Sequence, residues 1–125
     1  MVAFGRGCPV CHVLVIEDDW LIGEDIECVA RDNGATSVDR AETEADAIAL
    51  ALARPPAVIL SDVQLLDGTG PLAVLAIRQH LGPLPVIFIT ATPDACEPCD
   101  YAAAILCKPV MPAEVSQAFL KIISR

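Results

Sequence analysis

Positive charge and aromatic side chains are scarce in this sequence. Eight Lys and Arg residues stand against seventeen Asp and Glu residues, which gives a net charge of −9, and aromatic residues make up 4% of the chain. A nucleic-acid-binding surface needs clustered Lys and Arg, so this balance argues against one. The apolar runs are too short to span a membrane, and the first eleven residues lack the apolar region of a signal peptide. We therefore expect a cytoplasmic protein whose six cysteines are reduced thiols.

The abundant residues are aliphatic. Hydrophobic residues make up 54% of the 125 residues, which suits one domain with an aliphatic, alanine-rich core. We expect a tail over residues 1–11 and a single domain over residues 12–125. Apolar runs typical of buried strands alternate with helical periodicity, which predicts a parallel sheet covered by helices on both faces. The expected strands cover 13–16, 35–40, 57–60, 85–90 and 103–107, and the expected helices cover 20–33, 42–54, 71–81 and 112–124.

Local patterns refine this expectation. Asp19 is expected to cap the N-terminus of the first helix. The second helix is expected to direct four apolar residues toward the core: Ala45, Ile48, Ala49 and Leu52. Residues 91–102, between the fourth and fifth strands, contain two prolines and no helical periodicity. We predict a loop or a single turn there in place of a helix.

Acidic residues follow two of the expected strands. Asp62 ends the apolar run in the stretch AVILSDVQLLDGTG, and Glu17 and Asp18 end the first strand in the same way. Ligands bind beyond the carboxyl ends of parallel strands, so these residues are candidates for a site. If the two strands are neighbours, the three carboxylates converge and need a cation. Their oxygen atoms suit Mg²⁺ bound together with a phosphate group.

Thr90 and Lys108 end the fourth and fifth strands, at the same expected edge of the sheet. A Lys ammonium and a Thr hydroxyl can both donate hydrogen bonds to the oxygens of a group carried on Asp62. Each residue alone is ordinary at the end of a strand. The whole set, at successive strand ends, indicates a site for phosphoryl chemistry.

The motifs VLVIEDD, ILSDVQLLDGTG, VIFITA and LCKP, in this order and spacing, resemble the receiver domain of two-component response regulators, the CheY-like family. The likeness covers about residues 12–123. It implies a flavodoxin-like, doubly wound, five-stranded parallel sheet with strand order 2-1-3-4-5. It also implies no enzymatic activity beyond the chain's own phosphorylation and slow dephosphorylation. Because no effector domain follows the last expected helix, we expect a single-domain regulator that signals through protein–protein contacts.

The resemblance assigns a role to each acidic residue. Asp62 would accept a phosphoryl group from the phosphohistidine of a sensor histidine kinase. Asp18, Asp62 and the main-chain carbonyl of Gln64 would bind Mg²⁺, with Glu17 acting mostly through water.

The resemblance also covers the other strand ends. Thr90 and Lys108 would bind the phosphoryl oxygens, and the Lys108–Pro109 peptide bond would be cis. Ile105 occupies a position that is usually aromatic in the family, so the usual route from the acceptor to the output face is altered. We expect the output to run through residues 91–101 and the final helix instead.

A closer likeness lies within the family. DVQLLDGTG, PVIFITATP and Glu97-Pro98 resemble receivers of the PhyR-type regulators of the alphaproteobacterial general stress response, whose fourth helix is short or disordered. The sequence resembles only the receiver half of those regulators, so it is either a free-standing relative or a receiver taken from a longer protein. The downstream protein is unknown, and a monomer or weak homodimer is expected.

Two C-x-x-C pairs allow other interpretations. Their spacing suits a four-thiolate zinc site, and the residues concerned are Cys8, Cys11, Cys96 and Cys99. The first pair, followed by His12, also matches the c-type haem attachment pattern. A redox role and ordinary thiols remain open for both pairs.

The remaining cysteines and the second histidine have simpler expectations. Cys28 and Cys107 are expected in the core, and His80 is expected at the surface near a helix end.

Two rival functions use the same residues. An aspartyl-phosphate hydrolase of the haloacid dehalogenase type also needs a strand-end Asp, a Thr and a Lys. It usually has a second Asp two residues after the nucleophile, where this chain has Gln64. A receiver-like adaptor that is not phosphorylated, or is clamped by zinc, is the other rival.

Overall fold

The sheet has five parallel strands in the order β3-β2-β4-β5-β6, which is the expected order 2-1-3-4-5 counted along the chain. The computed structural model describes residues 11–97 and 99–123. The strands are β2 (His12–Ile16), β3 (Ser37–Ala41), β4 (Val58–Ser61), β5 (Val86–Thr90) and β6 (Ala104–Cys107). The helices are α1 (Trp20–Asp32), α2 (Glu44–Ala53), α3 (Gly70–Leu81) and α4 (Pro112–Ile123). The flavodoxin-like fold class is confirmed.

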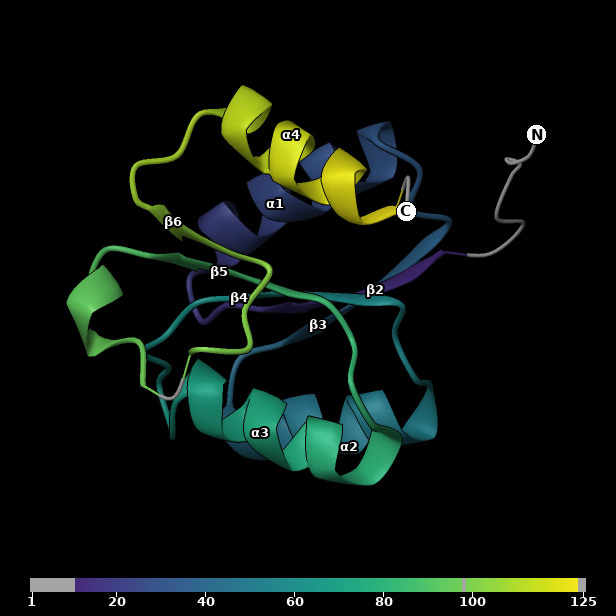
Figure 1. Ribbon diagram of the computed structural model, residues 1–125, viewed down its shortest axis with the longest axis vertical. Helices are drawn as coiled ribbons and strands as arrows, with labels where there is room; N and C mark the ends of the chain where they lie inside the picture. Colours follow the sequence, from purple (N-terminus) through teal and green to yellow (C-terminus); the bar gives the residue numbers. More distant parts are fainter. Residues whose placement is uncertain (1–10, 98, 124–125) are drawn as a thin grey trace.

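Helices cover both faces of the sheet (Figure 1): α1 and α4 pack on one face, and α2 and α3 pack on the other. The strands β2, β4 and β5 are buried along their whole length, because their side chains alternate between two apolar clusters. Their near-continuous Val, Ile and Leu runs are typical of strands covered on both faces. Within the described residues, no helix is both long enough and apolar enough to cross a membrane.

Side-chain caps fix where three of the helices begin. The Asp19 carboxylate accepts hydrogen bonds from the main-chain N–H groups of Leu21 and Ile22, which confirms the expected cap of α1. Thr43 caps α2 and Thr69 caps α3 in the same way. These caps satisfy main-chain donors that the first helical turn leaves unpaired.

The predicted inner face of α2 is wrong. Ala47 and Ala51 are the buried residues of this helix, whereas Ala45, Ala49 and Leu52 are exposed and Ile48 is half-buried. The helix reads EADAIALALA, so small apolar residues occur all round it and the sequence marks no face clearly. Tertiary packing selects the side that holds only alanines, which lets α2 lie close to the sheet and to α3.

Cys28 and Cys107 are exposed, so their predicted place in the core is also wrong. Cys107 ends β6, which among the described residues pairs with β5 alone and lies at the edge of the sheet. Side chains alternate along a strand, and Ile105 and Cys107 lie on the face of β6 that is exposed to solvent. Cys28 lies on the outer side of α1. His80 is exposed as expected, and its ring hydrogen-bonds the carbonyl of Ala76.

The segment between β5 and β6 contains only the short 3₁₀ helix η1 (Pro93–Ala95) among its described residues. This confirms the prediction of a loop or single turn. The expectation of reduced thiols is wrong here, because Cys96 and Cys99 are joined by a disulfide bond. A disulfide offers no thiolates for zinc, so the structure does not favour the four-thiolate site; Cys8 lies outside the described residues.

Tyr101 anchors the far end of this segment. Its hydroxyl donates a hydrogen bond to the carbonyl of Pro71 at 3.2 Å, and its ring lies edge-on to Phe88. The Arg78 guanidinium lies over the Tyr101 ring, 4.7 Å from the ring centroid. Burial raises the pKa of Tyr101 to about 12, although the positive charge of Arg78 opposes the increase. The segment is therefore held against α3 by a neutral phenol.

Alkaline titration tests this anchor. Tyr101 is the only tyrosine in the chain, so phenolate absorbance reports on it alone. We expect a midpoint near pH 12 in the folded protein and about 10 in urea. Because the unfolded state ionises first, stability should be unaffected below about pH 10 and should fall as the pH rises from there toward 12. A folded-state midpoint equal to the value in urea would contradict the buried anchor.

Candidate functional site

Main-chain hydrogen bonds hold the site residues one position beyond the strand ends. The N–H groups of Glu17, Asp62 and Lys108 donate to carbonyls at the ends of β3, β2 and β5, at 2.8 to 2.9 Å. The ladder of the parallel sheet therefore continues into the site. This is why residues distant in sequence lie at one edge, as the strand-end argument predicts.

Lys108 lies between two carboxylates. Its Nζ donates to Oε1 of Glu17 at 2.8 Å and to Oδ2 of Asp62 at 2.9 Å. The contacts are shielded from water, since the side chain of Glu17 is 1% exposed and that of Lys108 is 16% exposed. Charge-assisted hydrogen bonds of this length are among the stronger polar contacts in proteins. The ammonium is thereby fixed beside the carboxyl oxygens of Asp62.

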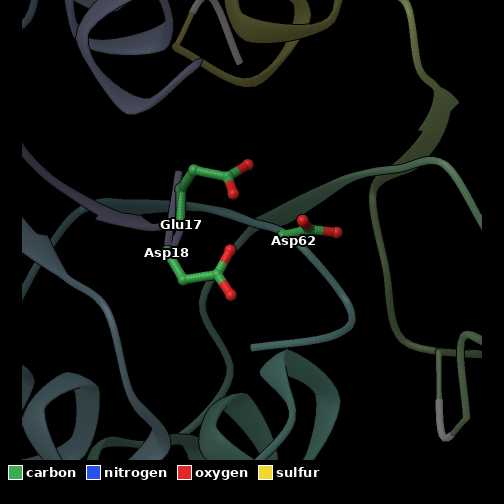
Figure 2. Close-up of side chains that lie close together, drawn as sticks. All are labelled: Glu17, Asp18 and Asp62. Carbon is green, nitrogen blue, oxygen red and sulfur yellow. The ribbon is translucent and has the colours of Figure 1, made fainter. Parts of the chain in front are cut away.

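Asp18 completes an acidic cluster with these residues. Oxygen atoms of Glu17, Asp18 and Asp62 all lie within 4.8 Å of one another. Figure 2 shows the carboxylates of Glu17 and Asp18 extending from the end of β2 toward the side on which Asp62 lies. Three carboxylates and one ammonium leave a formal charge of −2 in a partly buried site. Such a site favours a further cation.

The pKa shifts at the site follow from burial and from the ion pairs. Burial raises the pKa of Glu17 above its ordinary value, hydrogen bonds from Lys108 and from the Asp19 main chain oppose this, and the charge of Asp62 adds to it. Burial alone would lower the pKa of Lys108, but its hydrogen bonds to Glu17 and Asp62 raise it above the ordinary value. Lys108 therefore keeps its positive charge at neutral pH.

The backbone around Asp62 is tightly fixed. The N–H of Val63 donates to Oδ1 of Asp62 at 2.6 Å, and the hydroxyl of Ser61 donates to the Asp62 carbonyl at 2.7 Å. Gly70, the first residue of α3, approaches so closely that an added Cβ would overlap both that carbonyl and the Ser61 hydroxyl. Its N–H donates to the carbonyl of Val63. A glycine is required here because any side chain would displace Asp62.

Thr90 lies at the end of β5, and it is almost fully buried. Its hydroxyl oxygen accepts a hydrogen bond from the Thr92 N–H at 3.0 Å and shares another with the Thr92 hydroxyl at 3.2 Å. In this structure, Thr90 is thus hydrogen-bonded to Thr92. Gln64 lies in the loop after β4, where it pairs with Thr69 in an isolated bridge. The Lys108–Pro109 peptide bond is cis, as expected.

The donor set fits Mg²⁺. This ion prefers oxygen ligands at about 2.1 Å, so two ligands on opposite sides of it lie roughly 4.2 Å apart. The spacing of the three carboxylates needs only a small closure to meet that geometry. Asp18 and Asp62 remain partly exposed, which leaves room for water ligands.

The family of this protein follows from its sequence together with this geometry. Residues 13–119 match the response regulator receiver domain family. The chain belongs to that family. The receiver domain is 35% identical over 112 residues to the phyllosphere-induced regulator PhyR of Methylorubrum extorquens, which covers 84% of this chain and 40% of PhyR. It thus spans well under half the length of that curated relative.

Solved structures support the same likeness. The receiver domain of the PhyR response regulator from Erythrobacter litoralis superposes with a TM-score of 0.79 at 28% identity, over 92% of this chain and 91% of that one. A Bartonella quintana PhyR variant, described as an anti-anti-sigma factor, superposes with a TM-score of 0.73 at 30% identity, over 89% of this chain and 48% of that one. The expected likeness of this receiver domain to PhyR is confirmed.

Sequence reasoning missed two residues of the receiver site. Thr92 follows Thr90 by two positions, and that short spacing was the only signal that the two hydroxyls could meet. Gly70 had a clearer signal, because a glycine directly before the Pro71 of a helix start often marks a close backbone approach. The pairing of Lys108 with Glu17 was not expected either.

Proposed function

We propose that this chain is a response-regulator receiver domain that accepts a phosphoryl group on Asp62 from the phosphohistidine of a sensor histidine kinase. The observation that carries the proposal is the Lys108 ammonium fixed 2.9 Å from the Asp62 carboxylate, beside Glu17 and Asp18. In the transfer, an Asp62 oxygen forms a bond to phosphorus as the bond to the kinase imidazole breaks. The role of the chain's own residues is to position the acceptor and to stabilise charge.

Lys108 is the resident cation of this reaction. Three oxygens of the transferred group carry negative charge, and an ammonium that already touches the acceptor stabilises that charge without reorganisation. Thr90 is the second donor. Its hydroxyl is hydrogen-bonded to Thr92, so a rotation toward a phosphoryl group on Asp62 would break these contacts and pull on the segment that follows β5. That movement links the acceptor to a protein-binding surface formed by residues 91–101 and α4.

Asp18 and Asp62, with the main-chain carbonyl of Gln64, would hold Mg²⁺, and Glu17 would contribute mainly through water. Bound there, the metal supplies positive charge against the phosphoryl oxygens. The net negative charge of the three carboxylates and Lys108 supports this assignment.

The setting of the proposal is a cytoplasmic phosphotransfer system with a sensor histidine kinase upstream and an unidentified downstream protein. The Bartonella relative is a longer chain, of which the match covers 48%, so its description as an anti-anti-sigma factor does not identify a partner of this receiver domain. Gln64, in place of a second Asp, argues against turnover of phosphate esters by a hydrolase. Catalysis would be limited to the chain's own phosphorylation and slow dephosphorylation.

A beryllofluoride titration tests the proposal. Beryllofluoride mimics a phosphoryl group on a carboxylate, and Trp20, the only tryptophan, reports from the first residue of α1, two positions after Asp18. We expect saturable binding that requires Mg²⁺ in the wild type and no binding in Asp62→Ala. Saturable binding by Asp62→Ala would contradict the acceptor assignment.

Removal of a metal ligand gives a graded result in the same titration. Asp18→Asn should weaken Mg²⁺ binding at least tenfold, or by ~1.4 kcal/mol, because the site loses one anionic oxygen ligand. Asp32→Asn removes the same charge from the opposite end of α1 and is the matched control. An equal loss of affinity in the two variants would mean that net charge, and not coordination, is responsible.

A further inference from the structure

The Cys96–Cys99 disulfide lies in the segment that connects β5 with β6. Both residues are buried, at 6% and 9% exposure, in the apolar cluster that also contains Val74 and Phe88. Their Cα atoms are 5.5 Å apart, within the range that a disulfide requires. Residues 91–103 have no α-helix among the described residues and few main-chain hydrogen bonds of their own. A covalent link therefore takes the place of secondary structure in this part of the fold.

The spacing distinguishes this disulfide from one that only staples a fold. It closes a loop of two intervening residues, so it restricts the unfolded chain little and stabilises less than a long-range bridge. Paired cysteines with this C-x-x-C spacing are typical of thiols that cycle between oxidised and reduced forms. Cys28 and Cys107, in contrast, are exposed and have no such neighbour.

We propose that Cys96 and Cys99 are a reversible dithiol–disulfide switch that sets the conformation of residues 91–103 and thereby the response at Asp62. The second part rests on the function proposed above.

In this proposal, a low-molecular-weight disulfide oxidises the two thiols of Cys96 and Cys99. One cysteine thiolate attacks it to form a mixed disulfide and releases one small thiol. The second cysteine thiolate then attacks the mixed disulfide at the protein sulfur and releases the other small thiol. Two protein thiols are oxidised to one disulfide, the small disulfide is reduced to two thiols, and the two protein protons leave with them. Because the sulfurs are buried, exchange proceeds when the segment opens.

Hydrogen bonds connect the switch to Thr90. The N–H of Cys96 donates to the carbonyl of Pro93, and the N–H of Ala95 donates to the carbonyl of Thr92. Thr92 in turn donates its N–H to the Thr90 hydroxyl oxygen. In the oxidised segment, these contacts maintain the hydrogen bond from the Thr92 N–H to the Thr90 hydroxyl oxygen. Reduction loosens the segment, so that Thr90 can turn toward a phosphoryl group at lower cost.

Amide exchange and beryllofluoride binding, measured on the same protein in both redox states, test this proposal. The protein is equilibrated with glutathione disulfide or with excess glutathione, and the thiol count is read by alkylation and mass spectrometry. We expect reduction to speed amide exchange in residues 91–103 at least about tenfold. We also expect the reduced form to bind beryllofluoride with Mg²⁺ about fivefold more tightly than the oxidised form.

Two variants complete the design. The double variant Cys96→Ala, Cys99→Ala should resemble the reduced wild type under both conditions, and small apolar residues suit these buried positions. Cys28→Ser removes an exposed thiol and should keep the full redox response.

The proposal is overturned if glutathione disulfide leaves both thiols reduced, or if the two redox forms exchange amides and bind beryllofluoride alike. If neither form binds beryllofluoride, the phosphoacceptor function fails. Amide exchange then decides the switch alone: a difference between the redox forms supports it, and identical exchange rejects it.

Discussion

Asp62→Asn should abolish phosphorylation of the protein by acetyl phosphate with Mg²⁺, which means a loss of at least about a hundredfold in phosphoryl uptake. An amide has nearly the same shape as the carboxylate and keeps the acceptor for the Val63 N–H, but it is a poor nucleophile. It also takes one negative charge away from Lys108. Intact-protein mass spectrometry measures the uptake directly.

Asp67→Asn is the control for this result. Asp67 is an exposed carboxylate in the loop after the same strand, so the variant changes the charge equally and leaves the site untouched. It should be phosphorylated like the wild type. Uptake by Asp62→Asn at the wild-type rate would show that another residue is the acceptor.

Gly70→Ala should destabilise the fold by about 3 kcal/mol, because a methyl group at this position would overlap the Asp62 carbonyl and the Ser61 hydroxyl. The neighbours are main chain and a buried side chain, and neither can move away easily. Denaturant unfolding measures the loss. The variant should also bind beryllofluoride more weakly, since the overlap is with the acceptor residue itself.

Gly23→Ala provides the matched comparison. The atoms nearest to an added Cβ at Gly23, within α1, belong to the end of the Arg40 side chain, which can shift at the cost of its hydrogen bond to the Trp20 carbonyl. The gain in helix propensity and the displacement of Arg40 should nearly cancel, so the change should stay within about 1 kcal/mol. Equal destabilisation by the two substitutions would mean that the close approach at Gly70 is not what matters.

The site was predictable because parallel strands place their carboxyl ends at one edge. The positions of Glu17, Asp18, Asp62 and Lys108 needed only the strands and their order. The strands could be inferred from the apolar runs, whereas their order came from the resemblance to the receiver family. The break in helical periodicity before β6 likewise predicted the missing helix. These features depend on local patterns and on a topology that has few alternatives.

Other features depend on register and on packing, which a sequence does not reveal. His12 is buried and hydrogen-bonds Ser37 and Asp39, and these contacts exist only because β2 and β3 pair in one particular register. The buried side of α2 was misplaced because alanines occur all round that helix. Cys107 is exposed on β6, which lies at the edge of the sheet. An apolar run in the sequence does not indicate whether a strand lies at the edge or in the centre.

The central claim is that Asp62 carries the phosphoryl group, and chemical mapping of the phosphorylated residue tests it most directly. Borohydride converts an aspartyl phosphate to homoserine, which peptide mass spectrometry can locate in the chain. We expect homoserine at position 62 after phosphorylation with Mg²⁺, and none when the metal is chelated. Homoserine at position 18 or at any other aspartate, or none at all despite phosphoryl uptake, would contradict the account.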